Sequence, residues 1–135
     1  MLARMRSGYA VIGDTQHLPG YCLLLSDVAD ADHLTDLPRP ARAVFLADMA
    51  LLGEAILAAV PDVLRINYDI LGNSWGHLHA HVFARYAWEP DEYRRGPVWR
   101  YDEAVRQAPE HRLGAAHEPL RAAIAAELAR LTAEA

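Results

Sequence analysis

Three histidines occupy alternate positions in one short stretch of the chain, His77, His79 and His81, with apolar or small residues between them. In a β-strand successive side chains point to opposite faces, so the three imidazoles would line one face and the apolar residues the other. On a helix the side chains would advance by about 100° per residue, and the three rings would diverge. The spacing therefore predicts a strand over residues 77–84 with an imidazole face and a core face.

A row of imidazoles is suited to two chemistries. Neutral imidazoles bind zinc, and a catalytic zinc site with three histidines keeps one position open. Residues on the same strand face lie about 6.6 to 7 Å apart, however, so the third ring reaches a shared ion less well. Alternatively, a neutral histidine attacks phosphorus while its neighbours stabilise charge on the phosphate oxygens. A purely structural role is the weakest explanation of so dense a cluster.

A turn precedes the histidine strand and an arginine follows it. Gly72, Asn73 and Ser74 can place backbone N–H groups, an amide and a hydroxyl at the edge of the imidazole row. Arg85 is a candidate anchor for a phosphate or carboxylate, with an exposed strand-end arginine as the alternative. These residues extend the candidate site on both sides of the strand.

Apolar periodicity predicts the elements that position this strand. Apolar runs between turn signals predict strands over residues 9–14, 21–26, 63–70 and 77–84. Apolar residues at steps of three and four predict helices over residues 39–59 and 117–132. The short loop between the first two strands indicates antiparallel pairing. The order of strands and helices therefore predicts the α+β class with an antiparallel sheet.

The remaining segments are less regular. Residues 1–8 are expected to be frayed, and residues 86–100 read as a loop whose aromatic side chains either pack or fold back toward the histidines. The length is enough for one ordinary domain. We expect a single domain over residues 1–135, with its core at about 8–100 and a helical extension at about 101–135.

Composition narrows the class of protein. The chain is 53% apolar and 23% charged, with a net charge of -5, which argues against binding of a nucleic-acid backbone. Neither a signal peptide nor an apolar run of about 20 residues is evident, so no membrane segment is expected. Cys22 is the single cysteine, which fits a small buried residue in a reducing cytoplasm.

The wider motif resembles a known family. The stretch from His77 to Phe83 alternates histidine and apolar residues, and it follows the Asn73-Ser74 pair and Asn67. It resembles the histidine triad family of nucleotide hydrolases and transferases. The tail from Trp88 to Trp99 is similar to a bacterial branch described as diadenosine tetraphosphate hydrolase-like. The resemblance covers about residues 8–100 and implies an antiparallel sheet of about five strands, one long covering helix and a C-terminal helix.

The resemblance implies a reaction and a role for each histidine. A phosphoanhydride or phosphoramidate bond at a nucleoside α-phosphate, as in a dinucleoside polyphosphate, would be cleaved through a nucleotidyl-histidine intermediate. His79 would be the nucleophile, His81 would hydrogen-bond the phosphate, and His77 would orient the nucleophile. The family mechanism requires neither a metal nor a cofactor.

Binding roles follow in the same way. Asn73 and Ser74 would contact phosphate oxygens or the leaving group, and Asn67 would contact a phosphate or shape that wall. Nucleoside recognition is implied for the early strands and the segment after them, with the candidates His33, Leu23 and Leu25. The other histidines, His17, His111 and His117, are expected to lie on the surface.

The sequence departs from the family pattern in several places. Ala84 stands where proline is frequent, Asn73 stands where many relatives carry glutamine, and Tyr21 or a neighbour stands where some relatives carry a supporting histidine. The cysteine-based zinc site near the N-terminus of some relatives is missing. A homodimer and a small nucleotide substrate are the partners that the resemblance implies. A non-catalytic nucleotide-binding module and a zinc hydrolase remain as alternatives.

Overall fold

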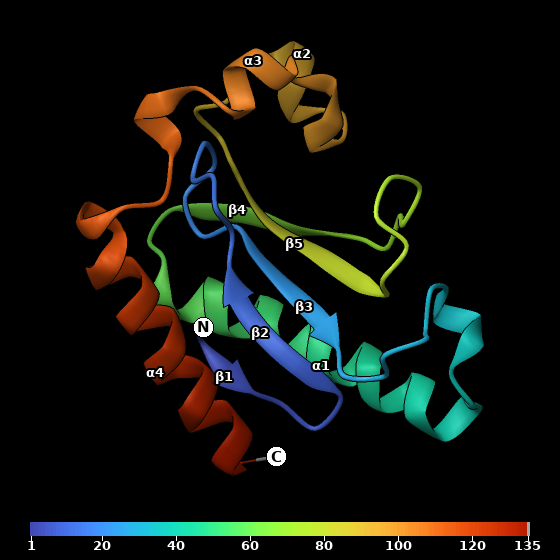
Figure 1. The fold of residues 1–135 in the computed structure, drawn as a ribbon. Coiled ribbons are helices and arrows are strands. Elements are labelled where there is room, and N and C mark those ends of the chain that lie inside the picture. The colour runs from blue at the N-terminus through green and yellow to red at the C-terminus, as the bar shows by residue number, and fades with distance from the viewer. Residues whose placement is uncertain (135) are drawn as a thin grey trace.

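The computed structural model describes residues 1–134 and places them in one antiparallel sheet with helices on both of its sides (Figure 1). The sheet has five strands in the order β1-β2-β3-β5-β4. The strands are β1 (Ala3–Arg4), β2 (Gly8–Ile12), β3 (Cys22–Ser26), β4 (Val63–Asp69) and β5 (His79–Tyr86). The helices are α1 (Arg39–Ala59), α2 (Asp91–Arg94), α3 (Glu103–Arg106) and α4 (Glu118–Glu134), with 3₁₀ turns at Leu34–Asp36, Val98–Arg100, Pro109–His111 and Ala115–His117. The predicted α+β class, with its five strands, long helix and C-terminal helix, is confirmed.

The histidine strand β5 lies inside the sheet, between β3 and β4. Leu25 and Leu23 of β3 lie opposite His79 and His81, and Asp69 of β4 lies opposite His81 on the other side. Because β5 is hydrogen-bonded along both edges, its backbone is held and its side chains alternate strictly between the two faces.

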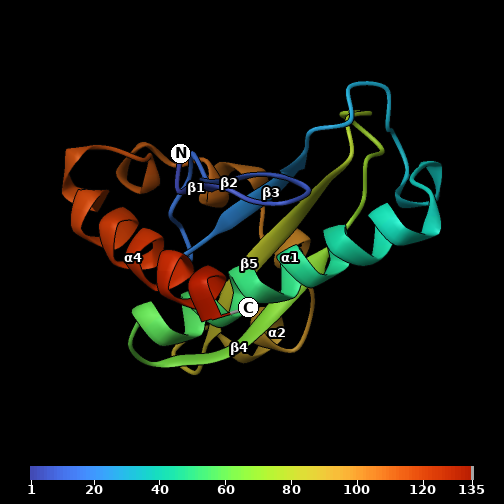
Figure 2. The same cartoon turned by 90° about the horizontal axis from the view of Figure 1, so that it is seen from below.

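One face of β5 is the core face. The α1 helix begins after Pro38 and carries proline in its first turn, where no intrahelical N–H is needed. Its Phe45, Leu52 and Ile56 are fully buried, as is Val82 of β5. Helix α4 packs beside α1 and also contacts β1, as Figure 2 shows from below. The two helices therefore close one side of the sheet.

The other face of β5 carries His79, His81, Phe83 and Arg85. The chain after β5 folds back over this face, with α2 and α3 on the side of the sheet away from α1 (Figure 1). The predicted loop over residues 86–100 thus contains α2 and a 3₁₀ turn. Its Trp99 ring lies 4.9 Å from the ring of His81, so this aromatic residue does fold back toward the histidines.

The N-terminus is ordered, and the expectation of frayed residues at positions 1–8 is wrong. Strand β1 pairs antiparallel with β2, with Ala3 opposite Ala10. The backbone N–H and the hydroxyl of Ser7 both donate to Asp48 Oδ2 of α1, at 2.8 and 2.6 Å. A short strand and a buried carboxylate therefore tie the segment down.

The histidine strand begins two residues later than predicted. Leu78 N donates to Ala31 O at 2.9 Å, and Ser26 N donates to Leu78 O at 3.0 Å, so the chain at Leu78 pairs with residues around the end of β3. His77 consequently lies just before β5. Within residues 1–134, no helix has the length and apolar character needed to cross a bilayer.

Candidate active site

His79 is held in one tautomer by its own strand. The ring is 5% exposed, and its Nδ1 lies 2.5 Å from the carbonyl oxygen of His77. A carbonyl only accepts hydrogen bonds, so Nδ1 carries the proton and donates it. The remaining nitrogen, Nε2, then has its lone pair free. This is the form of imidazole that can act as a nucleophile.

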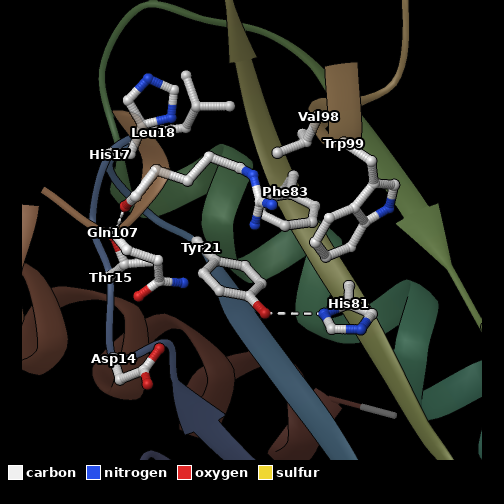
Figure 3. A pocket seen from close by; sticks show the side chains of 11 residues that line it. Asp14, Thr15, His17, Leu18, Tyr21, His81, Phe83, Val98, Trp99 and Gln107 are labelled. Atoms are coloured by element: carbon white, nitrogen blue, oxygen red, sulfur yellow. Dashed lines mark hydrogen bonds between the residues drawn. The ribbon is translucent and has the colours of Figure 1, made fainter. Parts of the chain in front are cut away.

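Tyr21, the last residue of the loop before β3, holds His81 in the opposite tautomer to that of His79. The Tyr21 hydroxyl and His81 Nδ1 are 2.7 Å apart, joined by the dashed line in Figure 3. Burial raises the pKa of Tyr21, so the hydroxyl keeps its proton and donates it. Burial, and His79 beside it, lower the pKa of His81 to about 4, so the ring is neutral near pH 7. Its Nε2 therefore bears a proton and is a hydrogen-bond donor.

His77 anchors the start of the row. Its Nε2 lies 2.7 Å from the carbonyl oxygen of Ser26, to which it donates a hydrogen bond. The same residue supplies the carbonyl that fixes His79. His77 thus contributes through its backbone to the tautomer of His79 and through its ring to the junction with β3.

His79 and His81 line a cavity of about 530 Å³, which is within the usual size of small-molecule sites. Its lining comes from β3, the loop before β5, β5 itself and the segment after it: Leu23, Leu71, Gly72, Asn73, Ser74, Trp75, His79, His81, Trp99, Glu103 and Arg106. Trp75 lies 4.7 Å from the His79 ring between centroids. Trp99 lies against His81 and donates from Nε1 to Asp69 Oδ2 at 3.1 Å. Two indoles therefore flank the imidazoles.

A second, smaller cavity of about 180 Å³ lies on the other side of His81. Figure 3 shows its lining side chains, among them Asp14, Tyr21, Phe83 and Trp99. The Tyr21 and Phe83 rings stack 4.1 Å apart and form an apolar wall. His81, Trp99 and Arg106 line both cavities, so the two are adjacent.

Several lining residues escaped sequence reasoning. Asp14 and Tyr21 lie at the ends of predicted strands, and nothing in the local pattern indicates that they approach the histidines. Arg106 and Glu103 come from a polar stretch with no clear periodicity. One signal pointed to Tyr21. It stands near the position where some members of the resembled family carry a histidine that supports the active site.

Arg85 and Asn67 are not brought to the imidazole cavity. The Arg85 side chain is 3% exposed and forms an ion pair with Glu89 at 2.9 Å. It also donates to Asn67 Oδ1 and to Gly96 O, each at 2.7 Å. The expectation of an exposed strand-end arginine is wrong, because Glu89 returns from the following loop and buries it. These partners occupy the guanidinium and the Asn67 amide oxygen, so neither is oriented toward a phosphate at His79.

The residues expected to recognise the nucleoside, His33, Leu23 and Leu25, lie in different places. His33 is exposed and lines a small cavity of about 150 Å³ together with Gly72 and His79. Leu23 lines the main cavity, whereas Leu25 lines neither of the two cavities beside His81. His17, expected on the surface, is half-buried in the smaller cavity.

Within the described part of the chain, no three histidine, cysteine or acidic side chains are placed to hold one ion. One nitrogen of each ring is in a hydrogen bond with the protein: His77 with Ser26 O, His79 with His77 O and His81 with the Tyr21 hydroxyl. Cys22 is buried, as predicted, and lies in the core.

The architecture matches that of solved histidine triad proteins. No protein-family model matches the sequence, and no curated protein matches it significantly. A histidine triad protein from Sinorhizobium meliloti 1021 is 23% identical, with a TM-score of 0.75 over 93% of this chain and 87% of that one. Histidine triad proteins from Marinobacter aquaeolei VT8 and Bradyrhizobium japonicum are each 22% identical, with TM-scores of 0.71 and 0.73. Alignments to these two cover 98% and 97% of this chain, and 88% of each of theirs.

The chain therefore has the histidine triad fold, as the resemblance of its histidine motif implied. Its histidine strand occupies an inner position of the sheet, with the imidazole face turned toward a cavity.

Proposed function

We propose that this chain is a nucleotide hydrolase or transferase that cleaves a phosphoanhydride or phosphoramidate bond at a nucleoside α-phosphate. The observation that carries the proposal is the tautomer of His79, whose Nδ1 is bound to a carbonyl and whose Nε2 is free. A buried imidazole whose Nδ1 is fixed as a donor presents Nε2 for attack on phosphorus, and it lines a cavity of ligand size.

The reaction has two steps. The lone pair of His79 Nε2 forms a bond to the α-phosphorus, while the bond from phosphorus to the leaving oxygen or nitrogen breaks and its electron pair departs with the leaving group. The imidazole becomes positively charged, and the His77 carbonyl at Nδ1 stabilises that charge. Water then adds to phosphorus, and the Nε2–phosphorus pair returns to His79. The net result adds hydroxyl to phosphorus and a proton to the leaving group.

The neighbouring groups are placed to bind the phosphate. The Tyr21 hydroxyl donates to His81 Nδ1, so the ring proton of His81 is on Nε2. This N–H donates to a non-bridging oxygen of the phosphate. Asn73 and Ser74 line the same cavity and supply an amide and a hydroxyl. The smaller cavity, with its Tyr21–Phe83 wall and the Asp14 carboxylate, is suited to a nucleoside. Asp14 is an acceptor for ribose hydroxyls there.

A direct test is product formation from diadenosine tetraphosphate and, separately, from adenosine phosphoramidate. We expect AMP from at least one of them, and none from the His79→Ala variant. The matched control is His117→Ala, because His117 hydrogen-bonds Gly114 far along the chain and lines neither cavity. Full activity of His79→Ala would refute the mechanism. Saturable nucleotide binding without turnover would favour the alternative, a non-catalytic nucleotide-binding module.

We also propose that the protein acts as a cytoplasmic homodimer on small nucleotides. Strand β4 is the outer strand at its edge of the sheet, so one row of its backbone groups is free to pair. Leu64 and Tyr68 on that strand are 58% and 41% exposed, and Leu57 of α1 is 50% exposed. Light scattering after size exclusion should give twice the chain mass, and Leu64→Arg should shift it toward the monomer.

A further inference from the structure

Arg106 is the cation at the junction of the two cavities. Among the described residues it is the one arginine that lines both of them, and the chain contains no lysine. The other lining residues of the main cavity carry apolar, polar uncharged or imidazole side chains, apart from the acidic Glu103. Any anion that enters beside the histidines therefore meets a single permanent positive charge.

The guanidinium is held in place and still has donors to spare. Its carbon lies 5.1 Å from the centre of the Trp99 ring, a cation–π contact. Its Nε donates to Tyr101 O at 3.3 Å, and within residues 1–134 this is the one hydrogen bond that the guanidinium forms. The two terminal nitrogens remain for a ligand. An arginine stacked on an indole loses less freedom on binding than one on a bare surface.

The backbone around Arg106 is also fixed. The Thr15 hydroxyl donates to the carbonyl of Arg106, which joins α3 to the loop between β2 and β3. Gln16 N donates to His111 O at 2.6 Å, and Leu113 N donates to Asp14 O at 2.8 Å. These contacts connect the segment that follows α3 to the residues that line the smaller cavity.

We infer that Arg106 binds phosphate oxygens of the leaving group, and that the site selects substrates with a polyphosphate leaving group over those with a neutral amine. The inference rests on the proposed function. In an in-line displacement the leaving group lies on the far side of phosphorus from the attacking nitrogen. His79 lines the main cavity from β5, and Trp99, Glu103 and Arg106 line the same cavity from the segment that follows β5. Arg106 is the cation of that segment at the cavity.

Glu103 provides a control because its charge is opposite to that of Arg106. It precedes Arg106 on α3, lines the same cavity and is exposed. Its carboxylate repels a polyphosphate by the same electrostatics that make Arg106 attract one. Replacement by the isosteric amide should therefore strengthen polyphosphate binding, and replacement of Arg106 should weaken it.

The first test is calorimetric titration of the intact protein with inorganic tripolyphosphate, which needs no turnover. A charged hydrogen bond is worth enough to expect a dissociation constant about tenfold or more higher in Arg106→Gln. Arg106→Lys should recover part of the loss, and Glu103→Gln should bind more tightly than the wild type. Arg130→Gln is the matched control, because Arg130 is exposed on α4 and paired with Glu127 and Glu134. Equal affinities in wild type and Arg106→Gln would overturn the inference.

The second test compares two substrates. In Arg106→Gln the ratio of kcat/KM for diadenosine tetraphosphate to that for adenosine phosphoramidate should fall about tenfold, mainly through KM for the tetraphosphate. An unchanged ratio would overturn the inference even if both rates drop. Absence of turnover by the wild-type protein, with tripolyphosphate binding that still depends on Arg106, would instead refute the proposed function and leave the polyphosphate site standing.

Discussion

The hydroxyl of Tyr21 lies 2.7 Å from Nδ1 of His81, and this contact determines which ring nitrogen faces the cavity as a donor. The neighbouring His79 has the opposite arrangement, because its Nδ1 donates to the His77 carbonyl. Two adjacent imidazoles on one strand face are thus in different tautomers. One presents a lone pair and the other presents an N–H, which is the pair of groups that attack on a phosphate requires.

Replacement of Tyr21 by phenylalanine should weaken this arrangement. The stacked ring remains, and only the hydroxyl that fixes His81 is lost. One hydrogen bond of ordinary strength, about 1 kcal/mol, corresponds to a fall in kcat of about fivefold. Steady-state kinetics with diadenosine tetraphosphate measure it. Tyr9→Phe, on an exposed tyrosine of β2, should change nothing, and an equal loss in both variants would contradict the role of Tyr21.

Stability should depend on pH through His81. Burial and the nearby His79 lower its pKa to about 4, below the value of about 6.5 expected in the unfolded chain. Between these two values the unfolded chain binds more protons, so the free energy of unfolding falls as pH drops from about 6.5 toward 4. His17 contributes with the same sign, because burial and His111 lower its pKa as well.

Urea denaturation at pH 7 and pH 4.5 measures this effect. The wild type should lose more stability between the two pH values than His81→Asn, whose amide does not titrate. Carboxylates elsewhere contribute to both proteins and cancel in the comparison. Identical losses would show that His81 does not carry the low pKa.

Removal of one partner from the buried pair of Arg85 and Glu89 should be strongly destabilising. Both side chains are nearly inaccessible, and the Tyr101 hydroxyl also donates to Glu89 at 2.7 Å. Glu89→Gln would leave a buried guanidinium without its counter-charge, at a cost of about 3 to 5 kcal/mol in the free energy of unfolding. The exposed pair of Glu118 and Arg121 is the matched control, where solvent screens the interaction and Glu118→Gln should cost far less stability. Similar costs at both sites would contradict the distinction.

The N-terminal segment should depend on Asp48. Asp48→Ala removes the carboxylate that accepts both hydrogen bonds from Ser7, and we expect a loss of about 1 to 3 kcal/mol in stability. Hydrogen exchange over residues 1–8 should accelerate in this variant. Glu54→Ala, on an exposed position of the same helix, should leave the exchange slow. Equal protection in the two variants would show that β1 pairing alone holds the segment.

The periodic elements were predictable from sequence because their pattern is local. The apolar stripe that includes Phe45, Leu52 and Ile56 gave α1 at residues 39–59, as observed. The alternation of His77, His79 and His81 gave a strand with an imidazole face, although pairing at Leu78 delays its start. Local alternation determines which side of a strand a residue faces, and it says nothing of the residues across the cavity.

The features that sequence reasoning missed depend on contacts between distant segments. Tyr21 reaches His81 across the sheet, and Arg106 reaches the cavity from a short helix with no apolar stripe. Arg85 was expected to be exposed at the end of its strand. Its partner Glu89 lies in the following loop, and no pattern in the sequence indicates that this loop folds back over Arg85. The two-residue strand β1 is too short to show any alternation.

The covalent intermediate at His79 is the central claim, and intact-mass spectrometry tests it most directly. The protein is incubated briefly with diadenosine tetraphosphate or adenosine phosphoramidate and quenched in alkali, because phosphohistidine bonds are labile to acid. The account predicts an adduct of one adenosine monophosphate in the wild type and in His117→Ala, and none in His79→Ala. Undiminished turnover by His79→Ala, or an adduct that persists in it, would contradict the account.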